Sequence, residues 1–345
     1  MSLLRPLSPE LEEAFFAYCA RYGRDHDESF IPSPPPPEEK GKYRPGGPCP
    51  SYLLLGQPEE PGAPDIQGVL SLIVSPSHAA AGKARVAVLH ALGGSSPEGR
   101  ARYQALIDQL ALFTAHSGLK PYLFLPAGLE IPAALLKEKG FKVERIVHAM
   151  RKSGLGSSNA ESPGPARVSE GPSGHFPEGF EVKHLAAGDD AALWAFVAVR
   201  NRNFREVEGS MDATVEEWRA RLVEPGALEG GAMLLLDPRG GSCGCLYAER
   251  DEDDGSLYLG TIGVDRDKRR MGLARALVRH ALRFGEERGF GSASLSVNES
   301  NAKALSLYLS EGFRIEKSMA CLSPGPEWPP GAEGPAEDRA VEKRG

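Results

Sequence analysis

Apolar positions in the second half of the chain follow helix and strand periods in a regular order. From Leu273 they recur every three or four residues, with Arg275, Arg279 and Arg283 on the opposite face, which predicts an amphipathic helix. Shorter apolar runs predict strands over 180–185, 232–237, 243–250, 256–264, 292–297 and 313–322, and further helical spacing predicts helices over 189–204, 214–222 and 301–312. This order of elements is typical of one mixed α/β domain over 180–322.

The first half repeats part of this order. Segment 123–144 aligns without gaps with 295–316, so that Gly140 falls opposite Gly312. Strands predicted over 51–56, 66–75 and 84–92, followed by a helix over 101–118, match the central strands and the helix of the second half. We therefore predict an internal duplication. The predicted fold class is α/β, with a mixed α+β sheet in each of two tandem domains, the first over 1–152.

Three segments have the composition of loops. Residues 153–179 are rich in Ser, Gly and Pro and nearly lack large apolar side chains, so they are predicted to be a linker. The end of the chain, 323–345, has the same composition and is predicted to be a disordered tail. The proline-rich segment 31–50 is predicted to be a long loop within the first domain.

Charge and composition limit the partners. The chain has 345 residues, a formal net charge of −7 and 25% charged residues, so it offers no general attraction to nucleic acid or an anionic membrane. It shows no apolar run of the ~20 residues that a membrane helix needs and no apolar signal-peptide core at its start. Its 5 cysteines are scattered, and Cys243 and Cys245 lack a second ligand pair, so we predict no metal site and a cytoplasmic location.

One short stretch is basic, although the chain as a whole has a negative net charge. The stretch RRMGLAR, 269–275, lies between a predicted strand and a predicted helix. A helix start exposes unpaired N–H groups, and Gly272 has no side chain to keep a ligand from them. Arg269, Arg270 and Arg275 would add positive charge, which favours a phosphate site. The alternative is an ordinary glycine-containing turn with solvated arginines.

The context of this turn resembles a known family. Val264, Arg269, Gly272 and Ala274 follow the spacing of the acyl-CoA-binding motif of the GNAT superfamily of N-acetyltransferases. The downstream segment also matches that family, at Asn301, Ala304, Leu307, Tyr308, Gly312 and Phe313. The resemblance covers about 180–322. The glycine patterns of dinucleotide-binding and P-loop folds are missing from the sequence.

The resemblance implies acetyl-CoA as co-substrate. The strand 256–264 would splay from its neighbour, helped by Gly260 and Gly263, and would pair with the pantetheine arm as with an added strand. An amide near Val264 would stabilise the oxyanion, and the amides of the turn would hold the pyrophosphate. The cofactor-binding residues implied are Ile262, Gly263, Val264, Arg269, Arg270, Met271, Gly272, Leu273, Ala274, Arg275 and Asn301.

The resemblance also implies catalytic roles. Tyr308 would protonate, or donate a hydrogen bond to, the departing thiolate; the alternative is an aromatic residue packed on the sheet. Glu249 is a candidate base for the attacking amine, or else a solvated residue at a strand end. Glu206, Glu208 and Asp212 lie where this family lines its acceptor cleft and would favour a cationic amine; the alternative is an exposed acidic loop.

The first domain lacks these counterparts. The alignment places Leu136 opposite Tyr308 and Leu129 opposite Asn301, and segment 93–102 replaces the arginine–glycine turn. We therefore interpret 1–152 as a degenerate GNAT-like domain. The tandem layout, with Phe204, Glu206 and Trp218 in the acceptor region, resembles the mycothiol synthase group of the superfamily.

The predicted function is acetyl-CoA-dependent transfer of an acetyl group to a primary amine of a small molecule. Acetylation of protein N-termini or lysines, and a non-catalytic acyl-CoA-binding module, remain open as alternatives.

Overall fold

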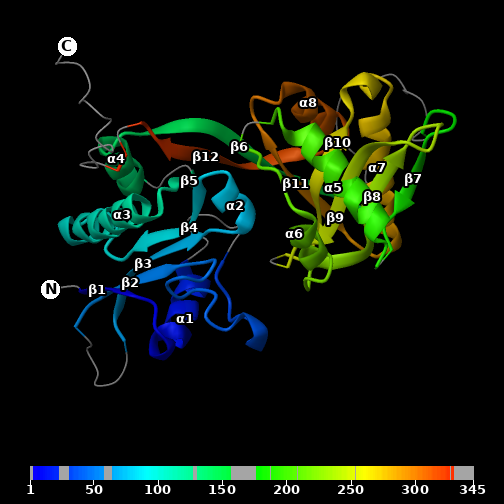
Figure 1. Cartoon of the computed structure of the whole chain (residues 1–345). Coiled ribbons are helices and arrows are strands. Elements are labelled where there is room, and N and C mark those ends of the chain that lie inside the picture. Colours follow the sequence, from blue (N-terminus) through cyan, green and yellow to red (C-terminus); the bar gives the residue numbers. More distant parts are fainter. Residues whose placement is uncertain are drawn as a thin grey trace, which may run out of the picture. The chain divides into compact units, whose positions relative to one another are not determined.

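The computed structural model describes residues 3–22, 31–57, 64–126, 130–156, 176–186, 188–207, 209–252, 254–326 and 328–329. The chain divides into two compact units: unit 1 comprises Met1–Glu144 with Met319–Gly345, and unit 2 comprises Arg145–Ser318 (Figure 1). Each contains a mixed sheet covered by helices on both faces, which confirms the predicted α/β class. Within the described residues, no helix combines the length and the apolar character needed to cross a membrane.

The sheet of unit 1 has two covered faces. Helix α1 (Glu12–Tyr22) buries Phe15 on one face, and α3 (Pro97–Ser117) and α4 (Glu130–Glu138) cover the other. Short helical segments η1 (Pro9–Leu11), η3 (Pro37–Glu39) and α2 (Pro76–Ala80) connect the strands. In sheet order the strands are β1 (Leu3–Pro6), β2 (Ser51–Leu55), β3 (Ile66–Ile73), β4 (Lys83–Ala91), β5 (Lys120–Pro126) and the end of β12 (Arg314–Pro324).

Unit 2 repeats this plan. Helices α5 (Asp190–Phe204) and α6 (Val215–Arg221) pack on one face of its sheet, and α7 (Leu273–Glu287) and α8 (Ala302–Ser310) pack on the other. The short helix η4 (Arg266–Lys268) lies between β10 and α7. In sheet order the strands are β7 (Glu181–His184), β8 (Ala227–Leu236), β9 (Ser242–Arg250), β10 (Leu257–Val264), β11 (Ser292–Asn298) and the end of β6 (Phe141–Ser153), from Arg145 onward.

Several element boundaries follow from local chemistry. Helix α6 begins at the predicted capping box, in which Thr214 and Glu217 bond each other's backbone. Helix α3 begins at Pro97, ahead of the predicted start, because Ser96 caps it and proline suits the first helical position. The predicted loop 31–50 contributes Tyr43 and Cys49 to the core beside Phe15, so it covers part of unit 1.

The end of the last strand of each half belongs to the other unit: β6 from Arg145 onward lies in unit 2, and β12 from Met319 onward lies in unit 1. Strand β6 pairs with β11, from Val147 opposite Asn298 to Ser153 opposite Ser292. Strand β12 pairs with β5, from Met319 opposite Pro126 to Leu322 opposite Leu123. The units therefore differ from the ranges 1–152 and 180–322, which were assigned by chain order, because hydrogen bonding and not sequence position decides where a strand belongs.

The predicted linker and tail are described only in part. Residues 157–175 and 330–345 lie outside the described residues. At the start of the predicted disordered tail, β12 continues to Pro324. Beyond it, Trp328 packs edge-on against Phe141 at 4.9 Å between ring centroids and donates to Thr114 Oγ1 at 2.9 Å. This part of the tail is therefore ordered on unit 1, because a large aromatic side chain finds apolar surface there.

The exchange of strands makes a testable prediction. Replacing Leu322 with alanine removes a buried side chain from the core of unit 1 and is expected to lower its free energy of unfolding by about 2–4 kcal/mol. Hydrogen exchange should show faster opening of β5 with β11 unchanged. The control is Ile315→Ala in the same strand, where the side chain is 43% exposed and an effect below about 0.5 kcal/mol is expected. Loss of protection in β11 instead would contradict the exchange.

Candidate functional site

Strands β10 and β11 separate along part of their length. They pair in parallel only at Leu257 opposite Ala293 and Tyr258 opposite Ser294. Strand β10 nevertheless stays paired with β9 up to Val264, with an irregularity at Gly260 between Leu259 and Thr261. The predicted splay is therefore present, and the β10 edge beyond Tyr258 has no strand partner on the β11 side among the described residues.

The turn after β10 leaves its backbone amides open. Gly272 caps α7 with φ +79°, and a Cβ placed on it would meet no heavy atom within 4 Å. Within the described part of the chain, the amides from Arg270 to Arg275 have no hydrogen-bond acceptor, and the first helical bond runs from Ala276 N to Gly272 O at 3.0 Å. A run of unpaired N–H groups at a helix start, with the positive end of the helix dipole, favours a bound anion.

Arg270 adopts an unusual backbone conformation in this turn. Its φ of +68° lies in the left-handed region, and no other non-glycine residue described in the structure has a positive φ. Such a conformation costs a residue with a Cβ roughly 1–2 kcal/mol. The chain thus holds strain at the point where the amides face outward.

This strain predicts the effect of a substitution. Arg270→Gly is expected to raise the free energy of unfolding of unit 2 by about 0.5–1 kcal/mol, because relief of the left-handed strain exceeds the backbone entropy of glycine. Arg270→Ala removes the same charge but keeps the Cβ, so it should bring no gain. Thermal unfolding measures both, and equal effects of the two variants would contradict the assignment of strain.

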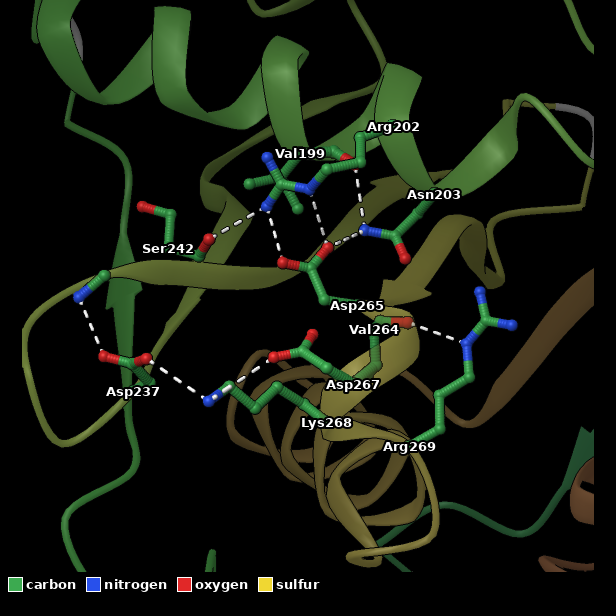
Figure 2. A network of polar contacts seen from close by, with 11 residues as sticks. Val199, Arg202, Asn203, Asp237, Ser242, Val264, Asp265, Asp267, Lys268 and Arg269 are labelled. Carbon is green, nitrogen blue, oxygen red and sulfur yellow. Dashed lines mark hydrogen bonds and ion pairs between the residues drawn. The ribbon is translucent and has the colours of Figure 1, made fainter.

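The arginines around the turn have different surroundings. Arg269 Nε donates to Val264 O at 3.1 Å, as Figure 2 shows. Arg275 pairs with Glu311 at 2.9 Å and donates to Ser310 Oγ at 3.0 Å, which ties α7 to α8. The Arg275 side chain is therefore engaged, whereas its amide is open. The guanidinium of Arg270 contacts no acceptor among the described residues.

Tyr308 has a buried aromatic ring. It lies in α8, is 7% exposed, and packs edge-on against Phe313. Burial, and to a lesser degree the neighbouring Tyr258, raises the pKa of Tyr308 to about 12. Its Oη has no hydrogen-bond partner among the described residues. The phenol therefore keeps its proton at neutral pH and can donate a hydrogen bond to a ligand.

Asn301 and Glu249, two other predicted site residues, already have hydrogen-bond partners within the protein. Asn301 caps α8, with its Oδ1 accepting from Ala304 N at 3.3 Å. Glu249 accepts from Arg221 at 2.5 Å and 3.3 Å, and its side chain is only 14% exposed. Both bonds come from the Arg221 guanidinium, so the Glu249 side chain is held in place by this ion pair. Sequence reasoning missed Arg221, whose only signal was its place in a predicted helix.

The acidic segment after α5, which is predicted to line the acceptor site, is partly neutralised. Glu206 lies 3.6 Å from Arg266, and both side chains are exposed, so the pair contributes little stability. Glu208 lies outside the described residues. The charge of Glu206 is therefore partly balanced within the protein.

The corresponding turn of unit 1 is closed. At the start of α3, Gly99 N donates to the Ser96 hydroxyl and Arg100 N to the Ser96 carbonyl, each at 3.0 Å. A Cβ on Gly99 would lie 2.5 Å from Gly94 O, which shows how tightly the loop is packed. Leu136 is fully buried, as expected for a core residue in place of Tyr308, and Leu129 lies outside the described residues. Only unit 2 combines an open turn with a tyrosine in this place among the described residues.

Comparison with known proteins agrees with this geometry. Residues 195–313 match the sequence profile of the Acetyltransferase (GNAT) family. A mycothiol acetyltransferase of Thermomonospora curvata is 28% identical over 258 residues, covering 73% of this chain and 78% of that protein. One from Salinispora arenicola is 29% identical over 185 residues, covering 52% of this chain and only 55% of that protein.

Solved structures share the fold over most of the chain. A GCN5-related N-acetyltransferase from Sphaerobacter thermophilus has a TM-score of 0.62 at 16% identity, covering 93% of this chain and 95% of that one. A tandem GNAT protein from the clavulanic acid biosynthesis pathway has a TM-score of 0.61 at 14% identity, and the match covers 94% of this chain and 99% of that one. The splayed strand and the open turn both lie within residues 195–313, the part of the chain that matches the GNAT acetyltransferase family.

Proposed function

We propose that unit 2 transfers the acetyl group of acetyl-CoA, the acetyl donor of this family, to a primary amine of a small molecule. The observation that carries the proposal is the run of open amides at Gly272, next to the free edge of β10. A diphosphate and an extended amide-bearing arm are the ligand groups that fit these two features.

The donor would be held by backbone groups. The amides from Arg270 to Arg275 bind the pyrophosphate, and Arg269 and Arg270 supply positive charge around it. The arm of the coenzyme pairs along Ile262, Gly263 and Val264, where β11 has diverged. Asn301 approaches the coenzyme from the start of α8. A backbone amide near Val264 would face the thioester oxygen and stabilise the oxyanion.

The acetyl transfer then proceeds by direct attack. The nitrogen lone pair of the amine forms a bond to the thioester carbon, and the carbon–sulfur bond breaks as the tetrahedral intermediate collapses. The proton lost by the nitrogen ends on the sulfur of the released thiol. Tyr308 donates a hydrogen bond to the developing thiolate. Full transfer of its proton is uphill, because a phenol with a pKa of about 12 is a weaker acid than a thiol near ~8.5.

The class of acceptor is inferred from the relatives. The proteins that resemble this chain over 73% of its length and over 52% of its length are both named mycothiol acetyltransferase. That name supports an amine on a small molecule. Glu206 and Glu208 are proposed to face the acceptor, and Glu249 stays a proposed base in spite of its pairing with Arg221.

A thiol-release assay tests this proposal. The full chain should release free thiol from acetyl-CoA with members of a small-amine panel and much more slowly with a peptide pool. Preference for peptides would instead indicate a protein acetyltransferase. Binding of acetyl-CoA without thiol release from any amine would indicate a non-catalytic module. The full chain is required because β11 of unit 2 pairs with β6, which a fragment over 179–322 lacks.

A further inference from the structure

Asp265 is the centre of a polar network at the end of β10. It follows Val264 directly, and its side chain is only 15% exposed. Its carboxylate accepts from Arg202 Nε at 2.9 Å and Nη2 at 2.6 Å, and from Asn203 Nδ2 at 2.7 Å (Figure 2). Two parallel bonds from one guanidinium fix both the distance and the orientation of a carboxylate.

The two side chains that donate to Asp265 also donate hydrogen bonds to backbone carbonyls. Arg202 Nη2 also donates to Ser242 O at 3.0 Å, and Asn203 Nδ2 also donates to Val199 O at 3.0 Å. The amide of Asp265 donates to Cys243 O at 2.8 Å. The last turn of α5 and the start of β9 therefore converge on this one residue, and the network has few ways to rearrange.

The network adjoins the proposed coenzyme strand. A Cβ on Gly263 would lie 3.0 Å from Asn203 Cβ and 3.4 Å from Phe204 Cε2, so glycine allows α5 to pack closely on β10. Asn203 is thereby placed to reach Asp265. The close packing of the end of α5 on Gly263 therefore holds the last residues of β10 in place.

Asp265 is also hydrogen-bonded to the backbone of the turn that leads to Gly272. Its carbonyl accepts from Lys268 N at 2.9 Å, and the next backbone bond runs from Arg269 N to Arg266 O at 3.4 Å. The Arg269 side chain then returns to Val264 O. A shift of Asp265 would therefore be passed to the amides from Arg270 onward, which have no other anchor before α7 begins among the described residues.

We propose that Asp265 is a positioning residue for acetyl-CoA, which holds the pyrophosphate turn in register with the splayed strand through Arg202 and Asn203. This inference rests on the function proposed above. It assigns a role to a residue that does not touch the coenzyme. It also links the coenzyme turn to α5, the helix that leads into the acidic segment predicted to line the acceptor site.

The test compares two aspartates of one turn. Asp265→Asn keeps the shape but places a donor against Arg202, and it is expected to raise KM for acetyl-CoA about tenfold with kcat changed less than about twofold. The control Asp267→Asn removes the same charge from a side chain that is 74% exposed and pairs with Lys268, so both constants should stay within about twofold of wild type.

A milder variant covers the case in which Asp265→Asn does not fold. Arg202→Lys keeps the charge but loses the paired geometry, and it should raise KM about threefold. In the double variant Asp265→Asn with Arg202→Lys, the two effects on KM should be less than additive, because both substitutions disrupt the same ion pair. A fall in melting temperature with KM unchanged would overturn the positioning role. If calorimetry shows no binding of acetyl-CoA to the wild-type chain, the proposed function fails instead.

Discussion

Replacing Gly272 with glutamate is expected to weaken acetyl-CoA binding by about a hundredfold or more, as measured by titration calorimetry. The φ of +79° strains any residue with a Cβ, and the open space around that Cβ lets the new carboxylate extend to where the pyrophosphate would lie. Two like charges about 4 Å apart repel by ~1 kcal/mol in water and by about 4 kcal/mol at a partly shielded site. Removal of access to the amides adds to that repulsion.

The control for this variant lies at the other end of the same helix. Gly289 has φ +80°, and a Cβ placed on it would meet no heavy atom within 4 Å, as at Gly272. Gly289→Glu therefore carries the same backbone strain and the same charge, and it should lower the melting temperature comparably while leaving binding intact. Equal affinities for acetyl-CoA in the two variants would show that the turn at Gly272 does not contact the coenzyme.

Tyr308→Phe is expected to lower kcat by roughly ten- to a hundredfold with KM for acetyl-CoA nearly unchanged. The hydroxyl has no hydrogen-bond partner among the described residues, so its removal should not destabilise unit 2. The comparison variant is Tyr258→Phe, because Tyr258 is the neighbour that contributes to the raised pKa of Tyr308. A larger loss of kcat in Tyr258→Phe would transfer the proposed role to that residue.

The same residue sets the pH dependence on the alkaline side. A group whose pKa is raised to about 12 holds its proton below that pH, so the contribution of Tyr308 should persist throughout the range from about pH 7 to about pH 10. The rate should instead fall toward low pH, as the acceptor amine becomes protonated. A decline of kcat near the ordinary phenol pKa of about 10 in the wild type that is missing from Tyr308→Phe would show that the phenol titrates near its ordinary value.

Much of unit 2 could be predicted from the sequence because its signals are local. The strand 257–264, the glycine turn and the amphipathic helix from Leu273 are consecutive, and each is specified by period or by a capping residue. Helix α1 of unit 1 was not predicted, although Phe15, Tyr18 and Cys19 carry the helical spacing. The helical spacing was present in the sequence, but it extends over only a short segment.

The long-range features could not be predicted in the same way. The exchange of β6 and β12 depends on which edge each strand meets, and both strands have the pattern expected for either unit. The pairing of Arg275 with Glu311, of Glu249 with Arg221, and of Asp265 with Arg202 joins residues far apart in the chain. Charge in a sequence shows that partners are needed, but only the fold selects them.

The central claim is that the open amides at Gly272 hold the diphosphate of acetyl-CoA. Hydrogen exchange on the full chain, with and without saturating acetyl-CoA, tests it at single-amide level. The account predicts that the coenzyme slows exchange from Arg270 to Arg275 and along β10, while the start of α3 in unit 1 stays unchanged. Binding of acetyl-CoA with no added protection in that turn would contradict it.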